Sequence, residues 1–181
     1  MVARFGFWLF LLSDIIVFAG LFAAYAVLSI STADGPAGPE LFNRAHTFLE
    51  TTCLLLSSFT CGLMTLGVEI RRSSLIHASA AGTFALDVAF VGLELSEFMD
   101  LLARGAGPTR SAFLSAFFAL MGTHDLHVTA GLLWLVTMMA QIATLGLREM
   151  VVRRLFCFSL FWHALDIVWV GILTIVYLGA S

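Results

Sequence analysis

The sequence contains no lysine, and charged residues make up only 12% of its 181 residues. Its nine basic residues are all arginines, and they form no patch or stripe. This argues against nucleic-acid binding, which needs clustered positive charge. Hydrophobic residues reach 60% and the mean hydropathy is +1.00, outside the range of an ordinary soluble domain. The composition therefore indicates an integral membrane protein.

Cysteine and proline are also scarce, with three residues of each. Cys53, Cys61 and Cys157 all fall in apolar segments. An odd number of cysteines without paired spacing argues against a disulfide framework or a zinc site built on them. The prolines fall between the apolar runs, in Ser31–Asn43 and Arg104–Arg110, and these two segments are predicted to be loops.

Long apolar runs dominate the rest of the chain, each longer than the roughly 20 residues that cross a bilayer as a helix. Five runs predict five transmembrane helices: 5–30, 45–70, 75–102, 111–147 and 152–178. The first run is too long for a signal peptide and contains Asp14, so we expect it to be retained. The fourth is too short for two crossings. We therefore predict an all-α bundle of five transmembrane helices, forming one membrane domain over residues 1–181.

The placement of the arginines predicts how the chain is oriented in the membrane. If the amino terminus is cytoplasmic, six arginines lie inside, namely Arg4, Arg71, Arg72, Arg148, Arg153 and Arg154. Three then lie outside, namely Arg44, Arg104 and Arg110. The excess inside predicts a cytoplasmic amino terminus and a periplasmic carboxyl terminus. Small residues within the runs, for example Gly122 and Gly131, are expected to let the helices pack closely.

Ionisable residues nevertheless occur inside the apolar runs. They are Asp14, Glu50, Asp87, Glu94, Glu97, His124, Asp125, His127, His163 and Asp166. Each costs about 3 kcal/mol or more at the centre of a bilayer unless it is neutralised or paired, so we expect them to face one another inside the bundle. Asp87 and Glu94 are seven residues apart and therefore share a helix face, with Glu97 about one turn further on.

Two short segments combine histidine with a second polar residue. MGTHDLHV places His124 and His127 three residues apart, and FWHALDIVW repeats this spacing with His163 and Asp166. A His/Asp pair at this spacing can hydrogen-bond along one helix or reach a neighbouring helix. The expected packing aromatics are Trp162 and Trp169, and the expected membrane-interface anchors are Trp8 and Tyr177.

The residues alone leave three interpretations of these polar groups open. They can be interhelical hydrogen bonds that fix helix register and hold lipid. They can form a proton or ion path, because such paths are built from carboxylates and histidines. Alternatively, His124, His127 and His163 can ligate a metal or a haem, although two histidines three apart on one helix suit a compact metal site better than the two faces of a haem.

Taken together, the motifs resemble subunit III of the haem-copper terminal oxidases, most closely the quinol-oxidase branch with its bo-type ubiquinol oxidases. The resemblance covers essentially the whole chain and rests on FGFWLFLLSDIIVFAGLFAAYAVL, FVGLELSEF, SAFLSAFFALMGTHDLHVTAGLLW and FWHALDIVW, in that order. By motif, Asp14 matches the buried carboxylate of the first shared helix, and Glu97 matches the acid of the third. The family's histidines and aspartate are matched by His124, His127, His163 and Asp166.

The resemblance implies a non-catalytic accessory subunit of a proton-pumping ubiquinol oxidase in the bacterial inner membrane. Such a subunit has no cofactor of its own: the haems and copper are expected in subunit I, its main contact, and subunits II and IV are further expected partners. The complex oxidises ubiquinol, while this chain supports assembly, stability and phospholipid binding. The ten ionisable residues are then expected to form a polar network or to line a lipid pocket.

Two other functions remain as alternatives. One is a haem-bearing cytochrome b-type membrane anchor of a dehydrogenase, which needs axial histidines on facing helices. The other is a transporter or channel, whose sequence usually shows broken helices or an internal repeat that this chain lacks. One position also departs from the family pattern: Asp125 stands where the motif usually has glycine, so a further carboxyl must be accommodated close to His124.

Overall fold

The computed structural model describes residues 2–29 and 44–178, and all regular structure within them is helical. The elements are α1 (Val2–Leu28), α3 (Arg44–Glu69), α4 (Ser73–Ala103), α5 (Ala112–Leu145), α6 (Glu149–Ile172) and the π-helix η1 (Leu173–Leu178), which continues α6. Five helical segments are long and apolar enough to cross a membrane. The prediction of an all-α membrane bundle with five spans is therefore confirmed.

Each apolar run of the sequence overlaps one of these helical segments. The long fourth run forms a single helix, α5, of 34 residues, and the fifth run comprises α6 together with η1. Pro108 lies between α4 and α5, as expected for a residue that breaks a helix. The predicted loop Ser31–Asn43 lies outside the described residues.

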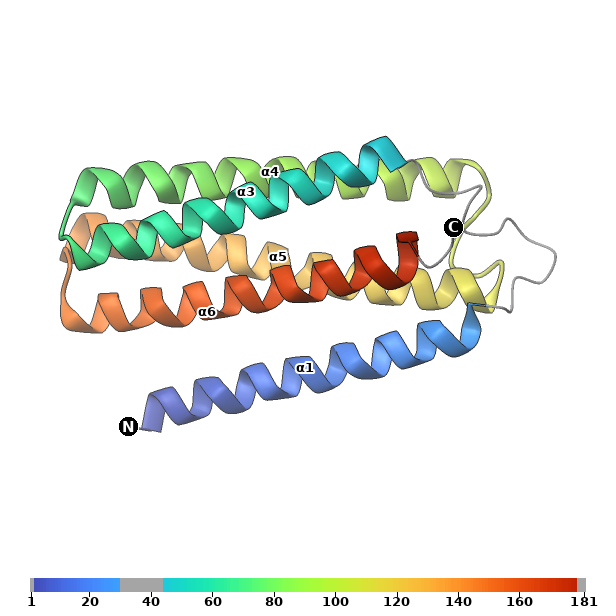
Figure 1. The fold of residues 1–181 in the computed structure, drawn as a ribbon, viewed down its shortest axis with the longest axis horizontal. Helices are drawn as coiled ribbons and strands as arrows, with labels where there is room; N and C mark the ends of the chain where they lie inside the picture. Colours follow the sequence, from blue (N-terminus) through green and yellow to red (C-terminus); the bar gives the residue numbers. More distant parts are fainter. Residues whose placement is uncertain (1, 30–43, 179–181) are drawn as a thin grey trace.

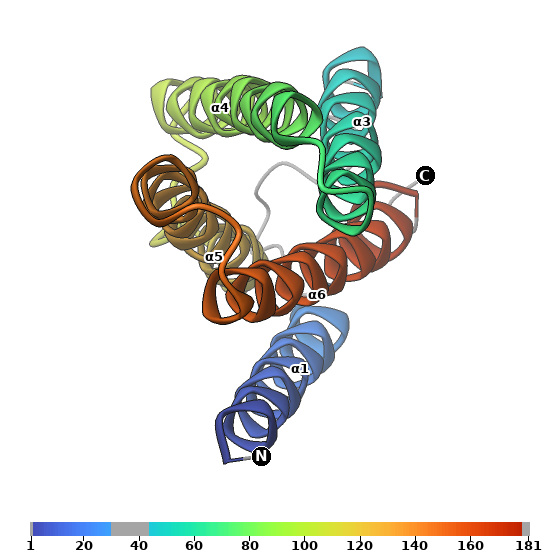
Figure 2. The ribbon, with the colours of Figure 1, turned by 90° about the vertical axis from the view of Figure 1, so that its left-hand side faces the viewer.

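Four helices, α3 to α6, surround a common core, and α1 lies outside this ring (Figures 1 and 2). Along the ring each helix packs against the next one in the chain, and α6 closes it by packing against α3. Successive helices run in opposite directions, because the connections between them are short (Figure 1). The helix α1 contacts α5 and, less extensively, α6. Among the described residues, one long side of α1 is therefore uncovered.

The turn from α3 to α4 shows why its residues allow close packing. Arg71 adopts a positive φ of 53°, and the Arg72 amide donates to the carbonyl of Gly67 at 2.9 Å. A β-carbon added at Gly67 would lie 2.9 Å from Ile76 Cγ1, so a larger residue there would push α4 away. At the same end of the bundle, Gly146 ends α5 with a φ of 69°, a conformation that glycine adopts without strain.

The bulkiest side chains in the core are aromatic. The largest fully buried ones are Trp162, Trp169, Phe90, Phe117 and Phe158. The ring of Trp162 packs over Gly131 of α5, where a β-carbon would meet Trp162 Cζ3 at 2.4 Å. The predicted role of Gly131 in close packing is thus confirmed, whereas Gly122 has no atom within 4 Å of such a β-carbon. The aromatic core holds α5 and α6 at a distance that only glycine permits.

Candidate functional site

The structure places every one of the ten predicted polar residues away from full exposure. Seven are buried, namely Glu50, Asp87, Glu94, Glu97, His124, Asp125 and Asp166, and three are half-buried, namely Asp14, His127 and His163. They do not form one network. Most of them fall into three groups, each of which connects different helices.

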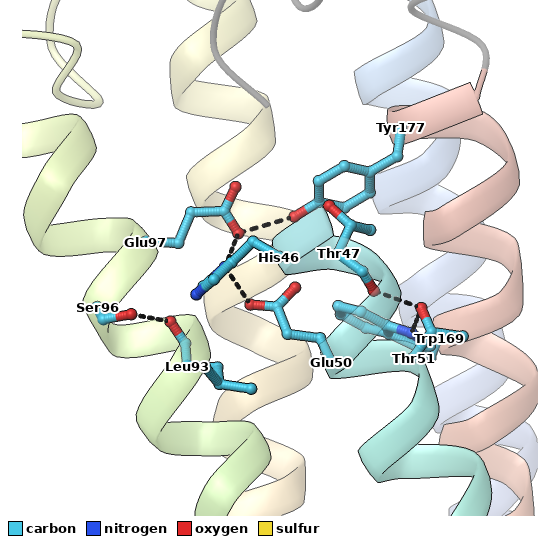
Figure 3. A network of polar contacts seen from close by, with 9 residues as sticks. All are labelled: His46, Thr47, Glu50, Thr51, Leu93, Ser96, Glu97, Trp169 and Tyr177. Atoms are coloured by element: carbon cyan, nitrogen blue, oxygen red, sulfur yellow. Dashed lines mark hydrogen bonds and ion pairs between the residues drawn. The ribbon is translucent and has the colours of Figure 1, made fainter. Parts of the chain in front are cut away.

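The first group, called here the carboxylate cluster, consists of Glu50, Glu94, Glu97 and Asp125 with His46 and Tyr177. His46 Nδ1 lies 3.2 Å from Glu50 Oε1 and 4.0 Å from Glu97 Oε2. The Tyr177 hydroxyl donates a hydrogen bond to Glu97 Oε2 at 3.2 Å. As Figure 3 shows, these side chains converge from α3, α4 and η1.

Two further carboxyls complete the carboxylate cluster. Glu94 is fully buried next to the carboxyl of Glu50, and Asp125 of α5 lies within electrostatic range of both. Within the described part of the chain, neither Glu94 nor Asp125 receives a hydrogen bond from a donor group. Asp125 thus joins the carboxylate cluster, whereas its neighbour in sequence, His124, does not.

The second group, called here the α3–α6 seam, consists of side-chain hydrogen bonds between two antiparallel helices. They are Trp162 Nε1 to Ser57 Oγ at 3.0 Å, His163 Nδ1 with Ser58 Oγ at 2.8 Å, and Trp169 Nε1 to Thr51 Oγ1 at 3.2 Å. Trp162 and His163 lie opposite Ser57 and Ser58, and Trp169, two turns later on α6, lies opposite Thr51, nearer the start of α3, as antiparallel packing requires. The indole N–H groups therefore serve as polar contacts, while the rings fill the core.

Two aspartates lie beside the α3–α6 seam. Asp166 Oδ2 is 3.6 Å from His163 Nδ1 on the same helix. Asp87 of α4 faces Ser57 and lies within electrostatic range of Asp166. Asp87 and Glu94 are both on the buried face of α4, as the seven-residue spacing predicts, yet they belong to different groups because two helical turns separate them.

The third group is a single pair that connects α1 to the ring. Asp14 Oδ1 of α1 lies 3.6 Å from His127 Nε2 of α5. The other ring nitrogen, His127 Nδ1, donates to the carbonyl of Thr123 at 2.7 Å, which fixes the orientation of the imidazole. The ring of Phe18 packs against that of His127 at a centroid distance of 5.3 Å. This pair therefore positions α1 against α5.

Replacing Asp14 with alanine is expected to loosen α1 while leaving the ring of four helices folded. The loss leaves His127 Nε2 without its partner, and because both side chains are only half-buried we expect a cost of about 1 kcal/mol, the lower end of the range for a polar group that loses its partner. Hydrogen exchange should therefore become faster in α1 than in α3 or α4. Asp14→Asn, which keeps an oxygen acceptor, is the matched control. Unchanged exchange in α1 of the alanine variant would contradict the prediction.

His124 belongs to none of these groups. Its ring is fully buried among aromatic rings, at centroid distances of 6.4 Å from Phe18, 5.9 Å from Phe90 and 5.3 Å from Trp169. Among the described residues, no three ligand atoms that could hold a metal ion include His124, His127 or His163. These three histidines have separate surroundings, so the sequence-based hypothesis that they ligate a metal or haem receives no support from the geometry.

Two members of the carboxylate cluster were missed by sequence reasoning. His46 lies at the very start of its apolar run, although its i, i+4 spacing from Glu50 is the signal that could have found it. The sequence pattern predicts Tyr177 as an interface anchor, whereas its hydroxyl is directed at Glu97 (Figure 3). Serine and threonine partners in the α3–α6 seam were also missed, because nothing in the sequence shows which of them face α6.

Comparison with known proteins identifies the family. The family model of cytochrome c oxidase subunit III matches residues 2–181. The chain belongs to this family. It is 51% identical over 174 residues to the cytochrome bo(3) ubiquinol oxidase subunit 3 of Pseudomonas aeruginosa, covering 96% of this chain and 83% of the relative. The resemblance to subunit III inferred from the motifs is therefore confirmed.

Other relatives within the subunit III family carry similar names. The cytochrome bo(3) ubiquinol oxidase subunit 3 of Pseudomonas putida is 49% identical, covering 96% of this chain and 84% of the relative. The quinol oxidase subunit 3 of Bacillus subtilis is 42% identical, covering 96% of this chain and 85% of the relative. This chain is thus a membrane subunit of a haem-copper oxidase complex, and the matches give no support to a cytochrome b-type anchor.

Proposed function

We propose that this chain is the third subunit of a bacterial proton-pumping ubiquinol oxidase and that it acts there as a non-catalytic accessory subunit. The observation that carries this proposal is the identity of 51% and 49% to two ubiquinol oxidase subunits over 96% of the chain. The side-chain geometry supports an accessory role, since the polar groups of the α3–α6 seam and the Asp14–His127 pair connect helices to one another.

The haems and copper of the complex would then lie in subunit I, the main contact of this chain, with subunits II and IV as further partners. The uncovered side of α1 supports this arrangement, because Phe5, Trp8 and Ile16 are all exposed there. Such a side must face lipid or an apolar partner helix, because it belongs to a helix long and apolar enough to span the membrane. We assign the buried polar groups a structural role in helix register, next to bound phospholipid.

The proposed orientation places the amino terminus in the cytoplasm and the carboxyl terminus in the periplasm. The arginine distribution supports it. Arg71 and Arg72 lie in the turn from α3 to α4, and Arg148 lies in the turn from α5 to α6, both at the same end of the bundle (Figure 1). In this orientation, the end at which α3 begins and η1 ends faces the periplasm.

The test is to purify this chain by an affinity tag in mild detergent, separate it from its companions, and record reduced-minus-oxidised spectra of each fraction. We expect the haem and copper to stay with a larger companion and the 19.7 kDa chain to be colourless. Quinol oxidase activity should depend on that companion. A haem spectrum that stays with the isolated chain would overturn the proposal in favour of the membrane-anchor alternative.

A further inference from the structure

The carboxylate cluster brings three potential metal-ligand atoms close together. One ligand atom each from His46, Glu50 and Glu97 lies within 4.8 Å of the other two. The distances from His46 Nδ1 are 3.2 Å to Glu50 Oε1 and 4.0 Å to Glu97 Oε2. Imidazole nitrogens and carboxylate oxygens bind Zn²⁺ at about 2.0–2.2 Å, which places neighbouring ligand atoms about 3.5 Å apart in a tetrahedral site. Small side-chain rotations therefore suffice to bring these atoms around one ion.

The charge of the carboxylate cluster also favours a cation. Glu50, Glu94, Glu97 and Asp125 all interact electrostatically with at least one other member. In the described residues, His46 is the basic side chain that pairs with them, and the arginine ion pairs lie elsewhere, at Asp100 and Glu149. Several carboxylates close together inside a membrane repel one another, and this is costly unless a cation or bound protons offset their charge.

A second, independent observation points to a ligand at this place. Glu94 is fully buried and lies against the carboxyl of Glu50, and neither of its oxygens receives a hydrogen bond within the described part of the chain. Asp125 is 9% exposed, and neither of its carboxyl oxygens receives a hydrogen bond from a described residue. Glu94 and Asp125 already interact with the group formed by His46, Glu50 and Glu97. Either carboxylate can therefore supply a further metal ligand or hydrogen-bond a metal-bound water.

The site lies at one end of the bundle, with its histidine partly exposed. His46 lies in the first turn of α3, and its side chain is 27% exposed, while Glu50 one turn deeper is fully buried. An ion arriving at this end of the bundle therefore meets the imidazole first and the carboxylates behind it. The arrangement joins α3 to α4, so an ion bound there would tie the two helices together (Figure 3).

We propose that His46, Glu50 and Glu97 form a binding site for a divalent transition-metal ion such as Zn²⁺, with Glu94 and Asp125 completing or supporting the coordination. The single imidazole nitrogen distinguishes this site from one for Ca²⁺ or Mg²⁺, which take oxygen ligands only. All of the proposed ligands belong to this chain.

The test uses the intact oxidase complex after treatment with a chelator, titrated with Zn²⁺ alone. We expect the wild type to bind one more Zn²⁺ per complex than His46→Gln, and Zn²⁺ affinity at this site to fall about tenfold or more in His46→Gln and in Glu97→Gln. Zinc X-ray absorption of the wild type minus His46→Gln should show nitrogen and oxygen ligands and no sulfur. Mg²⁺ at the same concentration should not compete.

The matched control is His77→Gln, which removes another half-buried histidine, near the first turn of α4 at the opposite end from Glu97. It should bind as much Zn²⁺ as the wild type. Equal Zn²⁺ binding by the wild type and His46→Gln would overturn the proposal, as would an equal loss in His77→Gln. Normal haem content and migration of each variant complex establishes that it has folded, so a loss of Zn²⁺ then reports the ligand itself.

Discussion

Replacing Gly131 with alanine is expected to lower the free energy of unfolding of this chain by about 1–3 kcal/mol, the usual cost of an added methyl group in a closely packed core. A β-carbon at this position would lie 2.4 Å from Trp162 Cζ3 and 3.1 Å from Phe161 Cε1. The Trp162 ring is 1% exposed and its Nε1 donates to Ser57 Oγ, so it cannot move without losing that hydrogen bond. The substitution therefore strains both the α5–α6 contact and the α3–α6 seam.

Gly122→Ala on the same helix is the matched control for Gly131→Ala. A β-carbon at Gly122 has nothing within 4 Å, so alanine there should be neutral or stabilise α5 by up to about 1 kcal/mol through its higher helix propensity. Equilibrium unfolding of the purified chain in mixed micelles, followed by circular dichroism, measures both variants. Equal midpoints for the two variants would show that α5 and α6 can move apart without cost.

The helices could be predicted from the sequence because a bilayer sets one length scale for every span. Which face of a helix meets which neighbour could not, since nearly every face of these helices is apolar. Gly122 and Gly131 illustrate the limit: both are small residues on one helix, yet only Gly131 lies against another helix. Small size indicates that close packing is possible, and the rotation of the helix decides whether it occurs.

The polar residues could be predicted for a similar reason: a charge inside an apolar run is conspicuous and costly, so it must have a partner. The partners themselves depend on depth as well as on face. Asp87 and Glu94 share a face of α4 but meet different groups, at Ser57 and at Glu50. His46 could not be predicted in this way because it lies at the edge of its apolar run, where a polar residue can reach water and needs no buried partner.

Tryptophan shows a further limit of sequence reasoning. Trp162 and Trp169, which the sequence predicts as packing aromatics, are 1% and 0% exposed. A hydropathy scale treats such rings as apolar and gives no sign that their N–H groups need acceptors. Ser57 and Thr51 provide these acceptors on α3. The segment FWHALDIVW thus contributes three side chains to the α3–α6 seam, namely Trp162, Trp169 and His163, which pairs with Ser58.

Replacing Trp169 with alanine is expected to have the largest effect of any single substitution considered for this chain, a loss of about 3–5 kcal/mol in the free energy of unfolding. The ring is fully buried, with centroids 4.8 Å from Phe90, 5.3 Å from His124 and 6.4 Å from Tyr177. Its removal opens a cavity where α4, α5 and α6 meet and also breaks the hydrogen bond to Thr51. The same unfolding experiment in mixed micelles measures this loss.

Two further variants separate the contributions of Trp169. Trp169→Phe keeps most of the ring but leaves Thr51 without the indole donor, so it should lose less than the alanine variant. Trp8→Ala removes a tryptophan that is 57% exposed on α1, and it should change the unfolding of the isolated chain little. If Trp8→Ala lowered the free energy of unfolding as much as Trp169→Ala, the prediction would be wrong, because the loss would then not depend on burial between α4, α5 and α6. The packing of the Trp169 ring therefore predicts the order of the losses in free energy of unfolding: largest for Trp169→Ala, smaller for Trp169→Phe and smallest for Trp8→Ala.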